Sequence, residues 1–227
     1  MNLFWRSSCV LCGYSTKQAV SLCADCQNDL PKIESACFKC GIPVAVGCKV
    51  CGQCIQKPPD VDYNFSAYHY ESPIDYLIAQ LKFEQKLFCA DILGHIMVTS
   101  LKTMPVQDNY PDVILPVPLH KKRLIKRGFN QSLEISKVVS KALKIPIDYQ
   151  LATRIRATKA QMELTALQRK KNIKGCFQVR SMSGYNHVVL IDDVVTTGST
   201  TNELAKSLKA SGIETVGVWA IARAKVK

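Results

Sequence analysis

The sequence lacks any run of about 18 consecutive apolar residues, which a membrane-spanning helix needs. Its first residues, MNLFWRSSCVLCG, also lack the long apolar core of a secretory signal peptide. These two absences predict a cytoplasmic protein whose thiols stay reduced, and they leave a peripheral association with the inner membrane open.

Acidic residues are nearly absent between residues 119 and 174. That segment holds 15 of the 30 Lys and Arg residues but only 3 of the 18 Asp and Glu residues. The difference equals the formal net charge of +12, so the remainder of the chain is neutral. A single positive block on an otherwise neutral chain indicates a polyanionic partner, either a pyrophosphate group or a nucleic acid.

Cysteine is scarce after residue 54, where only Cys89 and Cys176 remain, and we expect both of these to be structural. The other nine of the eleven cysteines lie within residues 9–54. Eight of them form four CxxC pairs, namely Cys9/Cys12, Cys23/Cys26, Cys37/Cys40 and Cys51/Cys54. Adding 28 to each position in the first two pairs gives the last two, which indicates an internal duplication. Cys48 would map onto Val20 and is therefore left out of the ligand set.

The duplicated pattern predicts two structural zinc sites. A CxxC turn lets two thiolates reach one ion, and two such turns complete a tetrahedral shell of four soft ligands. A cysteine-rich segment with few large apolar side chains depends on this metal binding for its folding free energy. Disulfides are disfavoured by the reducing compartment, and a redox pair does not explain a duplicated set. Sequential pairing of the units is the simplest arrangement, and an interleaved cross-brace stays open.

The residues Gln56 to Asp60 (QKPPD) favour an extended spacer, and we place the domain boundary there. The predicted units are a double zinc ribbon at residues 1–56 and a second domain at residues 61–227. In the second domain, apolar runs and helical spacing predict strands over 61–70, 112–117, 187–191 and 213–221, separated by helices over 74–81, 87–101, 129–143 and 199–210. This alternation predicts an α/β fold with a mostly parallel sheet, whose ligands bind beyond the carboxyl ends of the strands.

The run VVLIDDVVTTGST at residues 188–200 follows one of these strand ends. Gly198 permits a tight turn, and the backbone N–H groups of Thr196 to Thr200 at a helix N-terminus form an anion site. The neighbouring carboxylates Asp192 and Asp193 suit ribose hydroxyls and can help to hold a divalent cation. Together these groups describe a site for ribose 5-phosphate. The residues assigned to it are Asp192, Asp193, Thr196, Thr197, Gly198, Ser199 and Thr200.

In full, this run resembles the motif for phosphoribosyl pyrophosphate (PRPP) of type I phosphoribosyltransferases. The resemblance implies a mostly parallel sheet with helices on both faces, and Mg²⁺ bound with PRPP. It also places a pyrophosphate loop after the strand that ends near Val117. The residues assigned to that loop are Lys121, Arg123, Arg127, Gly128, Asn130 and Gln131.

The sequence RGFNQ at residues 127–131, together with the paired zinc ribbons before it, narrows the resemblance to one family. Over essentially its whole length the chain resembles the ComF family, which is linked to bacterial competence and the use of external DNA. The resemblance implies a mobile flap between the two sites, with Arg154, Gln161, Arg169 and Asn172 as its matching positions. It also implies partners, namely single-stranded DNA and proteins of the DNA-uptake machinery.

The sequence leaves open whether the chain is an enzyme, and no catalytic residue is assigned. The PRPP half of a transferase is present, but little sequence follows the last strand to cover an acceptor base. One hypothesis is a cytoplasmic accessory of DNA uptake that binds PRPP and single-stranded DNA. The others are a phosphoribosyltransferase acting on a nucleobase or amine, and a PRPP-responsive regulator without catalysis.

Overall fold

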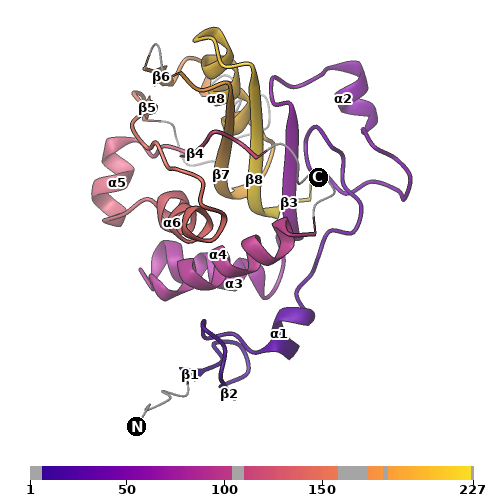
Figure 1. The fold of residues 1–227 in the computed structure, drawn as a ribbon, viewed down its shortest axis with the longest axis vertical. Helices are drawn as coiled ribbons and strands as arrows, with labels where there is room; N and C mark the ends of the chain where they lie inside the picture. Colours follow the sequence, from indigo (N-terminus) through magenta and orange to yellow (C-terminus); the bar gives the residue numbers. More distant parts are fainter. Residues whose placement is uncertain (1–6, 104–109, 158–172, 181–183, 226–227) are drawn as a thin grey trace.

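Four parallel strands form the central sheet of the computed structural model, which describes residues 7–103, 110–157, 173–180 and 184–225 (Figure 1). In spatial order they are β3 (Tyr63–His69), β8 (Thr215–Arg223), β7 (His187–Val195) and β4 (Val113–Pro116). Every neighbouring pair in this sheet is parallel. The predicted parallel α/β fold is therefore confirmed, and each strand overlaps the range expected from the sequence.

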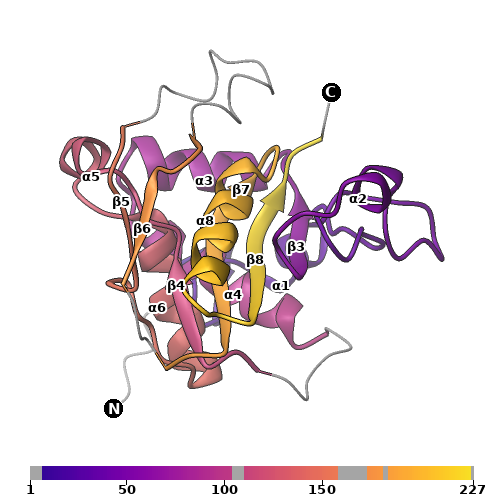
Figure 2. The same cartoon turned by 90° about the horizontal axis from the view of Figure 1, so that it is seen from above.

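Helices cover both faces of this sheet (Figures 1 and 2). The helices of one face are α3 (Ile74–Phe83), α4 (Phe88–Leu101) and α6 (Gln131–Leu143), and the other face carries α8 (Ser199–Ala210) with the two-stranded sheet of β5 (Ala152–Arg154) and β6 (Phe177–Val179). Alternate strand residues enter opposite cores, so Val189 packs toward α3, α4 and α6 while Leu190 packs toward α8. None of the helices in the described ranges is long and apolar enough to cross a membrane.

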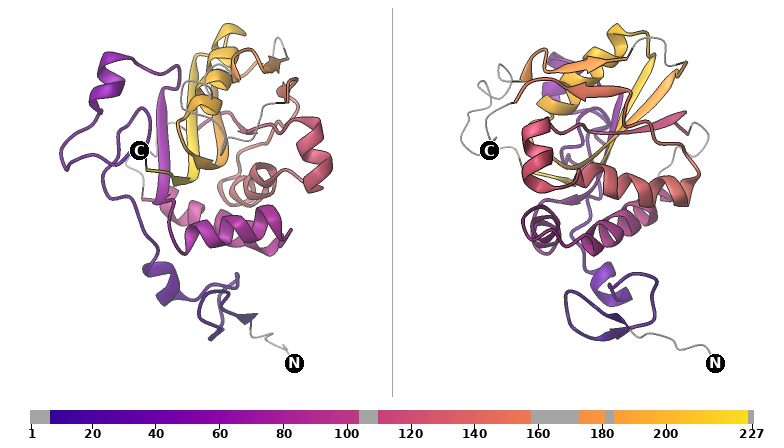
Figure 3. Two further views of the ribbon diagram at one scale, coloured as in Figure 1. Left: turned by 180° about the vertical axis from the view of Figure 1, so that it is seen from behind. Right: turned by 90° about the vertical axis from the view of Figure 1, so that its left-hand side faces the viewer.

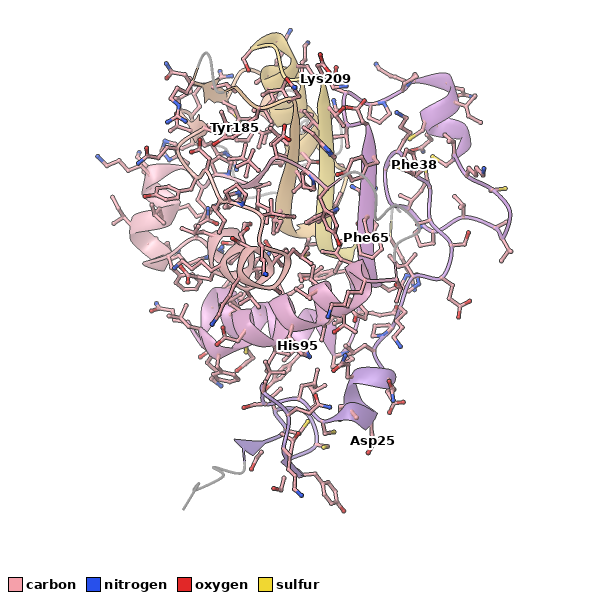
Figure 4. All side chains as sticks on the ribbon, viewed as in Figure 1. Asp25, Phe38, Phe65, His95, Tyr185 and Lys209 are labelled. Carbon is pink, nitrogen blue, oxygen red and sulfur yellow. The ribbon has the colours of Figure 1, made fainter. Side chains whose placement is uncertain are left out.

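The cysteine-rich segment forms two lobes that pack on different parts of the α/β domain (Figure 3). The first lobe, residues 7–30, contains β1 (Ser7–Ser8), β2 (Ser15–Thr16) and α1 (Ala24–Asn28), and the second lobe, residues 35–56, contains α2 (Gly52–Gln56). Leu22 and Leu30 of the first lobe join the apolar core beneath α3 and α4. Figure 4 shows Phe38 of the second lobe next to β3, whereas Asp25 lies on the first lobe at the far end of the molecule.

The segments that leave the lobes are fixed to the α/β domain. Ile33 donates its backbone N–H to Ala67, and His69 donates to Pro31, so this stretch covers the outer edge of β3. Asp60, which the sequence places in an extended spacer, exchanges two hydrogen bonds with Asn202 of α8, at 2.6 and 2.8 Å. The division at residues 1–56 and 61–227 stays a prediction, and the two parts share direct contacts.

Two local expectations need correction. β7 does not end at Ile191 but continues to Val195, because Val194 and Val195 pair with the last residues of β8. The stretch assigned to a pyrophosphate loop contains a short helix, α5 (Lys121–Arg127), capped by the His120 ring at its start. The sequence pattern missed α5 because its exposed charged residues give no apolar stripe.

Candidate functional site

The eight predicted cysteine ligands gather into two groups of four. Cys9, Cys12, Cys23 and Cys26 form one group, and Cys37, Cys40, Cys51 and Cys54 form the other, with all sulfur atoms in a group within 4.8 Å of one another. The pairing is therefore sequential, one group in each lobe, and the interleaved cross-brace is wrong. Cys48 lies exposed outside both groups, as its absence from the duplication predicts.

The spacing of the sulfur atoms fits a tetrahedral zinc ion. The Cys12 and Cys23 Sγ atoms lie 3.7 Å apart, and their counterparts in the second lobe, Cys40 and Cys51, lie at the same distance. Ligands about 2.3 Å from a zinc ion occupy tetrahedron corners about 3.8 Å apart. Four thiolates complete the shell, so each ion would have a structural role and no open position for substrate.

The TTGST loop, residues 196–200, follows β7 and leads directly into α8. Gly198 has φ 74°, a left-handed backbone conformation that residues with a side chain rarely adopt. This conformation lets the chain reverse direction just before the helix begins. The Thr197 and Ser199 hydroxyls are 2.8 Å apart, and Thr201 donates its hydroxyl to the Gly198 carbonyl. The loop therefore presents backbone N–H groups and hydroxyls at the N-terminus of a helix of 12 residues, which favours an anion.

The two carboxylates before this loop have different environments. The Asp193 side chain is buried, pairs with Lys82 of α3 and accepts a 2.9 Å hydrogen bond from the Gln131 amide. Burial raises the pKa of Asp193, but Lys82 and Gln131 more than offset it and keep that pKa below its ordinary value. Asp192 accepts from the Ser132 hydroxyl at 3.3 Å, and burial next to ionised Asp193 raises its pKa to about 7.

Basic side chains line the same cavity as the two carboxylates and the loop. They are Lys82, Arg123, Arg127 and Arg154. Arg127 donates to the Gln131 side chain, which in turn donates to Asp193, so a chain of hydrogen bonds links the basic residues to β7. Burial lowers the pKa of Arg127 and of Arg154, but arginine keeps its charge at neutral pH. The cavity thus combines a cationic wall, an acidic pair and an anion loop.

Many of the predicted site residues line this cavity. The predicted residues that line it are Asp192, Asp193, Thr196, Gly198, Ser199, Thr200, Arg123, Arg127, Gln131 and Arg154. Thr197 lines a neighbouring hollow on the other side of the loop. Lys121 is exposed at the start of α5, and Gly128 ends that helix with φ 82°. Asn130 caps α6 and donates to the Val117 carbonyl at 3.1 Å. Gln161, Arg169 and Asn172 lie outside the described residues.

Sequence reasoning missed Lys82 and Ser132, which contact the two carboxylates. Lys82 stands in an ordinary amphipathic helix with no motif around it, so only the packing of α3 against the sheet brings it to Asp193. Ser132 follows RGFNQ directly, and its position in the first turn of α6 was a usable signal, because that helix packs beside β7.

Fold and cavity together define an α/β protein with a parallel four-stranded sheet, a polar cavity at the carboxyl end of β7 and two N-terminal groups of four cysteines. A family model described as a double zinc ribbon domain matches residues 1–55. The adenine phosphoribosyltransferase of Leishmania tarentolae is a similar solved structure, 21% identical, with a TM-score of 0.35 over 60% of this chain and 56% of that one.

Curated relatives match over nearly the whole chain. The DNA utilization protein YhgH of Salmonella typhimurium is 36% identical over 206 residues, which cover 89% of this chain and 90% of that protein. Competence protein F of Haemophilus influenzae is 32% identical over 99% of this chain and 100% of its own length. Competence protein ComFC of Bacillus subtilis is 26% identical over 93% of this chain and 85% of that protein. The chain therefore belongs to the ComF family.

Proposed function

We propose that this protein binds PRPP together with Mg²⁺ in the cavity at the end of β7. The observation that carries this proposal is that Asp192 and Asp193 share one cavity with the TTGST loop and a wall of basic side chains. PRPP presents a 5′-phosphate, a pair of ribose hydroxyls and a diphosphate. The cavity offers a matching group for each of these three parts.

Each part of PRPP has a chemical partner in the proposal. The 5′-phosphate binds the N–H groups and hydroxyls of residues 196–200, at the positive end of α8. The ribose hydroxyls donate to the Asp192 carboxylate. The diphosphate binds the guanidinium groups of Arg123 and Arg127. Mg²⁺ would use oxygen ligands from the diphosphate and the acidic pair.

Calorimetric titration with PRPP and Mg²⁺ tests the proposal. Asp192→Asn and Ser199→Ala should each weaken binding by roughly tenfold or more, because the first replaces a charged acceptor with a neutral amide and the second removes a hydroxyl from the phosphate loop. Asp91→Asn, which changes an exposed carboxylate on α4, is the matched control. The proposal fails if the wild type does not bind PRPP, or if Asp192→Asn binds it as tightly as Asp91→Asn does.

The proposal includes a cytoplasmic role in DNA uptake or the use of external DNA, with single-stranded DNA and uptake proteins as partners. Relatives named for DNA utilization and competence support this role. So does α5, where Lys121, Lys122 and Lys126 are exposed beside the cavity wall that Arg123 and Arg127 form. Exposed cations of this kind bind phosphates along a strand and release counterions.

The salt dependence of oligonucleotide binding tests the DNA-binding part. Fluorescence anisotropy with an oligo-dT should show a Kd that rises steeply with salt. Changing Lys122 and Lys126 together to Gln should lower the slope of log K against log salt by about 1.4, since each phosphate contact on a single strand contributes about 0.7. Lys141 and Lys206, exposed on other helices, give the control double variant. Equal slopes in the two double variants would remove α5 from the interface.

Phosphoribosyl transfer is the second candidate function. It is favoured by the placement of cations for a departing diphosphate next to the carboxylates that would hold the ribose. Release of pyrophosphate from PRPP, followed with a panel of nucleobases and amines, is the test. Release that requires one acceptor establishes a transferase, whereas binding of PRPP without release across the panel leaves a binding protein or regulator.

A further inference from the structure

A buried guanidinium joins the second lobe to the start of the TTGST loop. Arg223, the last residue of β8, is only 3% exposed. Its Nε donates to the Cys40 carbonyl at 2.8 Å, and its Nη1 donates to the Val195 carbonyl at 3.0 Å and also to the Thr196 carbonyl. Arg223 thus contacts Cys40, a predicted metal ligand of the second group, and the first two peptide groups of the TTGST loop.

These contacts fix the direction of the first loop amides. A trans peptide is planar, so its C=O and the following N–H point to opposite sides. With the Val195 and Thr196 carbonyls held by Arg223, the N–H groups of Thr196 and Thr197 are directed away from the guanidinium. A positive charge beneath the loop also adds to the potential that attracts an anion.

The second lobe is fitted closely to β3, so the turn around Cys40 is a firm anchor for Arg223. Asn64 of β3 donates its backbone N–H to the Phe38 carbonyl at 2.8 Å. A Cβ atom on Gly41, the residue after Cys40, would lie 2.3 Å from the Asn64 Oδ1 atom, so there is no space between this turn and β3. The first lobe instead packs beneath α3 and α4.

We propose that Arg223 is a positioning residue that couples metal binding in the second lobe to the conformation of the TTGST loop. A metal ion in the second cysteine group fixes the turn around Cys40, this turn orients Arg223, and Arg223 holds the loop ready for a phosphate. The first lobe takes no part in this coupling. The ligand side of the inference rests on the proposed PRPP site. Because linkage is reciprocal, a phosphate ligand in the loop should in turn tighten metal binding in the second lobe alone.

Hydrogen exchange of the loop amides tests the coupling without any ligand. Cys51→Ser and Cys23→Ser are matched variants, because these ligands are equivalent under the duplication and disable the second and first groups respectively. The full-length variants and the wild type are compared with excess zinc present. Relative to the wild type, Cys51→Ser should speed exchange in the peptide covering residues 195–200 by roughly fivefold or more, while Cys23→Ser should not change it. Equal exchange in the two variants overturns the inference.

Arg223→Lys provides an independent variant. Lysine keeps the charge but lacks the planar guanidinium fork that serves several carbonyls at once. Exchange of the loop should rise in Arg223→Lys with both zinc ions bound, and adding Cys51→Ser should raise it no further, since both changes break the same connection. Additive effects would contradict a role for Arg223 as the connection.

Zinc affinity gives the reciprocal measurement. A chromogenic chelator competes for the one remaining ion of each cysteine variant, with and without ribose 5-phosphate. At equilibrium with the chelator, the ligand should raise the zinc affinity of Cys23→Ser, which keeps the second group, by roughly fivefold, and should leave that of Cys51→Ser unchanged. Binding of ribose 5-phosphate with no effect on zinc affinity overturns the coupling. A wild type that binds neither PRPP nor ribose 5-phosphate overturns the proposed function instead, and the exchange comparison still decides the coupling.

Discussion

The ammonium group of Lys82 on α3 pairs with the buried carboxylate of Asp193 on β7. This contact joins the helical layer to the strand that carries the acidic pair. Asp192 lines the same cavity as Lys82 and Asp193. Among the described ion pairs, none includes Asp192.

Replacing Lys82 with Met should lower the free energy of unfolding by about 1–3 kcal/mol, because Asp193 would lose a charged partner while staying buried. Urea unfolding measures the change. Lys86→Met, at an exposed lysine in the turn between α3 and α4, should cost no more than about 0.5 kcal/mol. Adding Asp193→Asn to Lys82→Met should recover part of the loss, and an unchanged stability in Lys82→Met would show that the ion pair contributes nothing.

Affinity for ribose 5-phosphate should rise between about pH 6 and 8, because Asp192, with a pKa of about 7, accepts from ribose hydroxyls when ionised. Asp192→Asn should lose this part of the pH dependence. The second ionisation of the ligand phosphate is the same in both proteins, so the comparison removes it. Identical pH profiles for Asp192→Asn and the wild type would contradict the assignment.

The same carboxyl group should make the folded protein less stable as the pH rises. Its folded pKa of about 7 lies above its ordinary value of 3.8, so the folded state binds more protons than the unfolded state between these values. The free energy of unfolding from this group is full below about pH 4 and falls as the pH approaches 7. The lowered pKa of Asp193 acts in the opposite sense, and only below about pH 4. Thermal unfolding of Asp192→Asn should lack the first effect.

Metal analysis of the purified chain should give two zinc ions per molecule. Cys12→Ser and Cys40→Ser, equivalent positions in the two groups, should each reduce the content to one, because three thiolates hold zinc far less tightly than four. Cys48→Ser should keep both ions, since Cys48 lies outside the groups. A lower zinc content in Cys48→Ser would mean that the ligand sets are wrong.

Gly41→Ala should destabilise the protein more than Gly13→Ala. Both glycines have positive φ, 72° and 76°, so each substitution costs about 1–2 kcal/mol in backbone strain. Only Gly41 also meets a neighbour, since its new Cβ would lie 2.3 Å from Asn64 Oδ1, while Gly13 has nothing within 4 Å. Chemical unfolding of the two variants measures the difference. Equal losses would show that the second lobe can shift away from β3 at no cost.

Local chemistry allowed the sequence alone to determine several features of this protein. The CxxC spacing and the duplication identified the eight ligand cysteines, because two thiolates on one tight turn reach one ion whatever the rest of the chain does. The order of acids, glycine and hydroxyl residues after an apolar run predicted the TTGST loop, since an anion site of this kind is formed by consecutive backbone groups. The alternation of strands and helices along the sequence indicated the parallel sheet, because each helix connects two strands that run in the same direction.

Only the tertiary structure decided which distant groups meet. The structure decided which CxxC turns share a group, a choice that the sequence left open. The ion pair of Lys82 with Asp193 and the hydrogen bond of Arg223 to Cys40 join segments that are far apart in the sequence. No local pattern marks these contacts, because they come from the packing of helices and lobes against the sheet. The loop sequence therefore predicts a phosphate site, while the fold determines which charges surround it and what holds it in place.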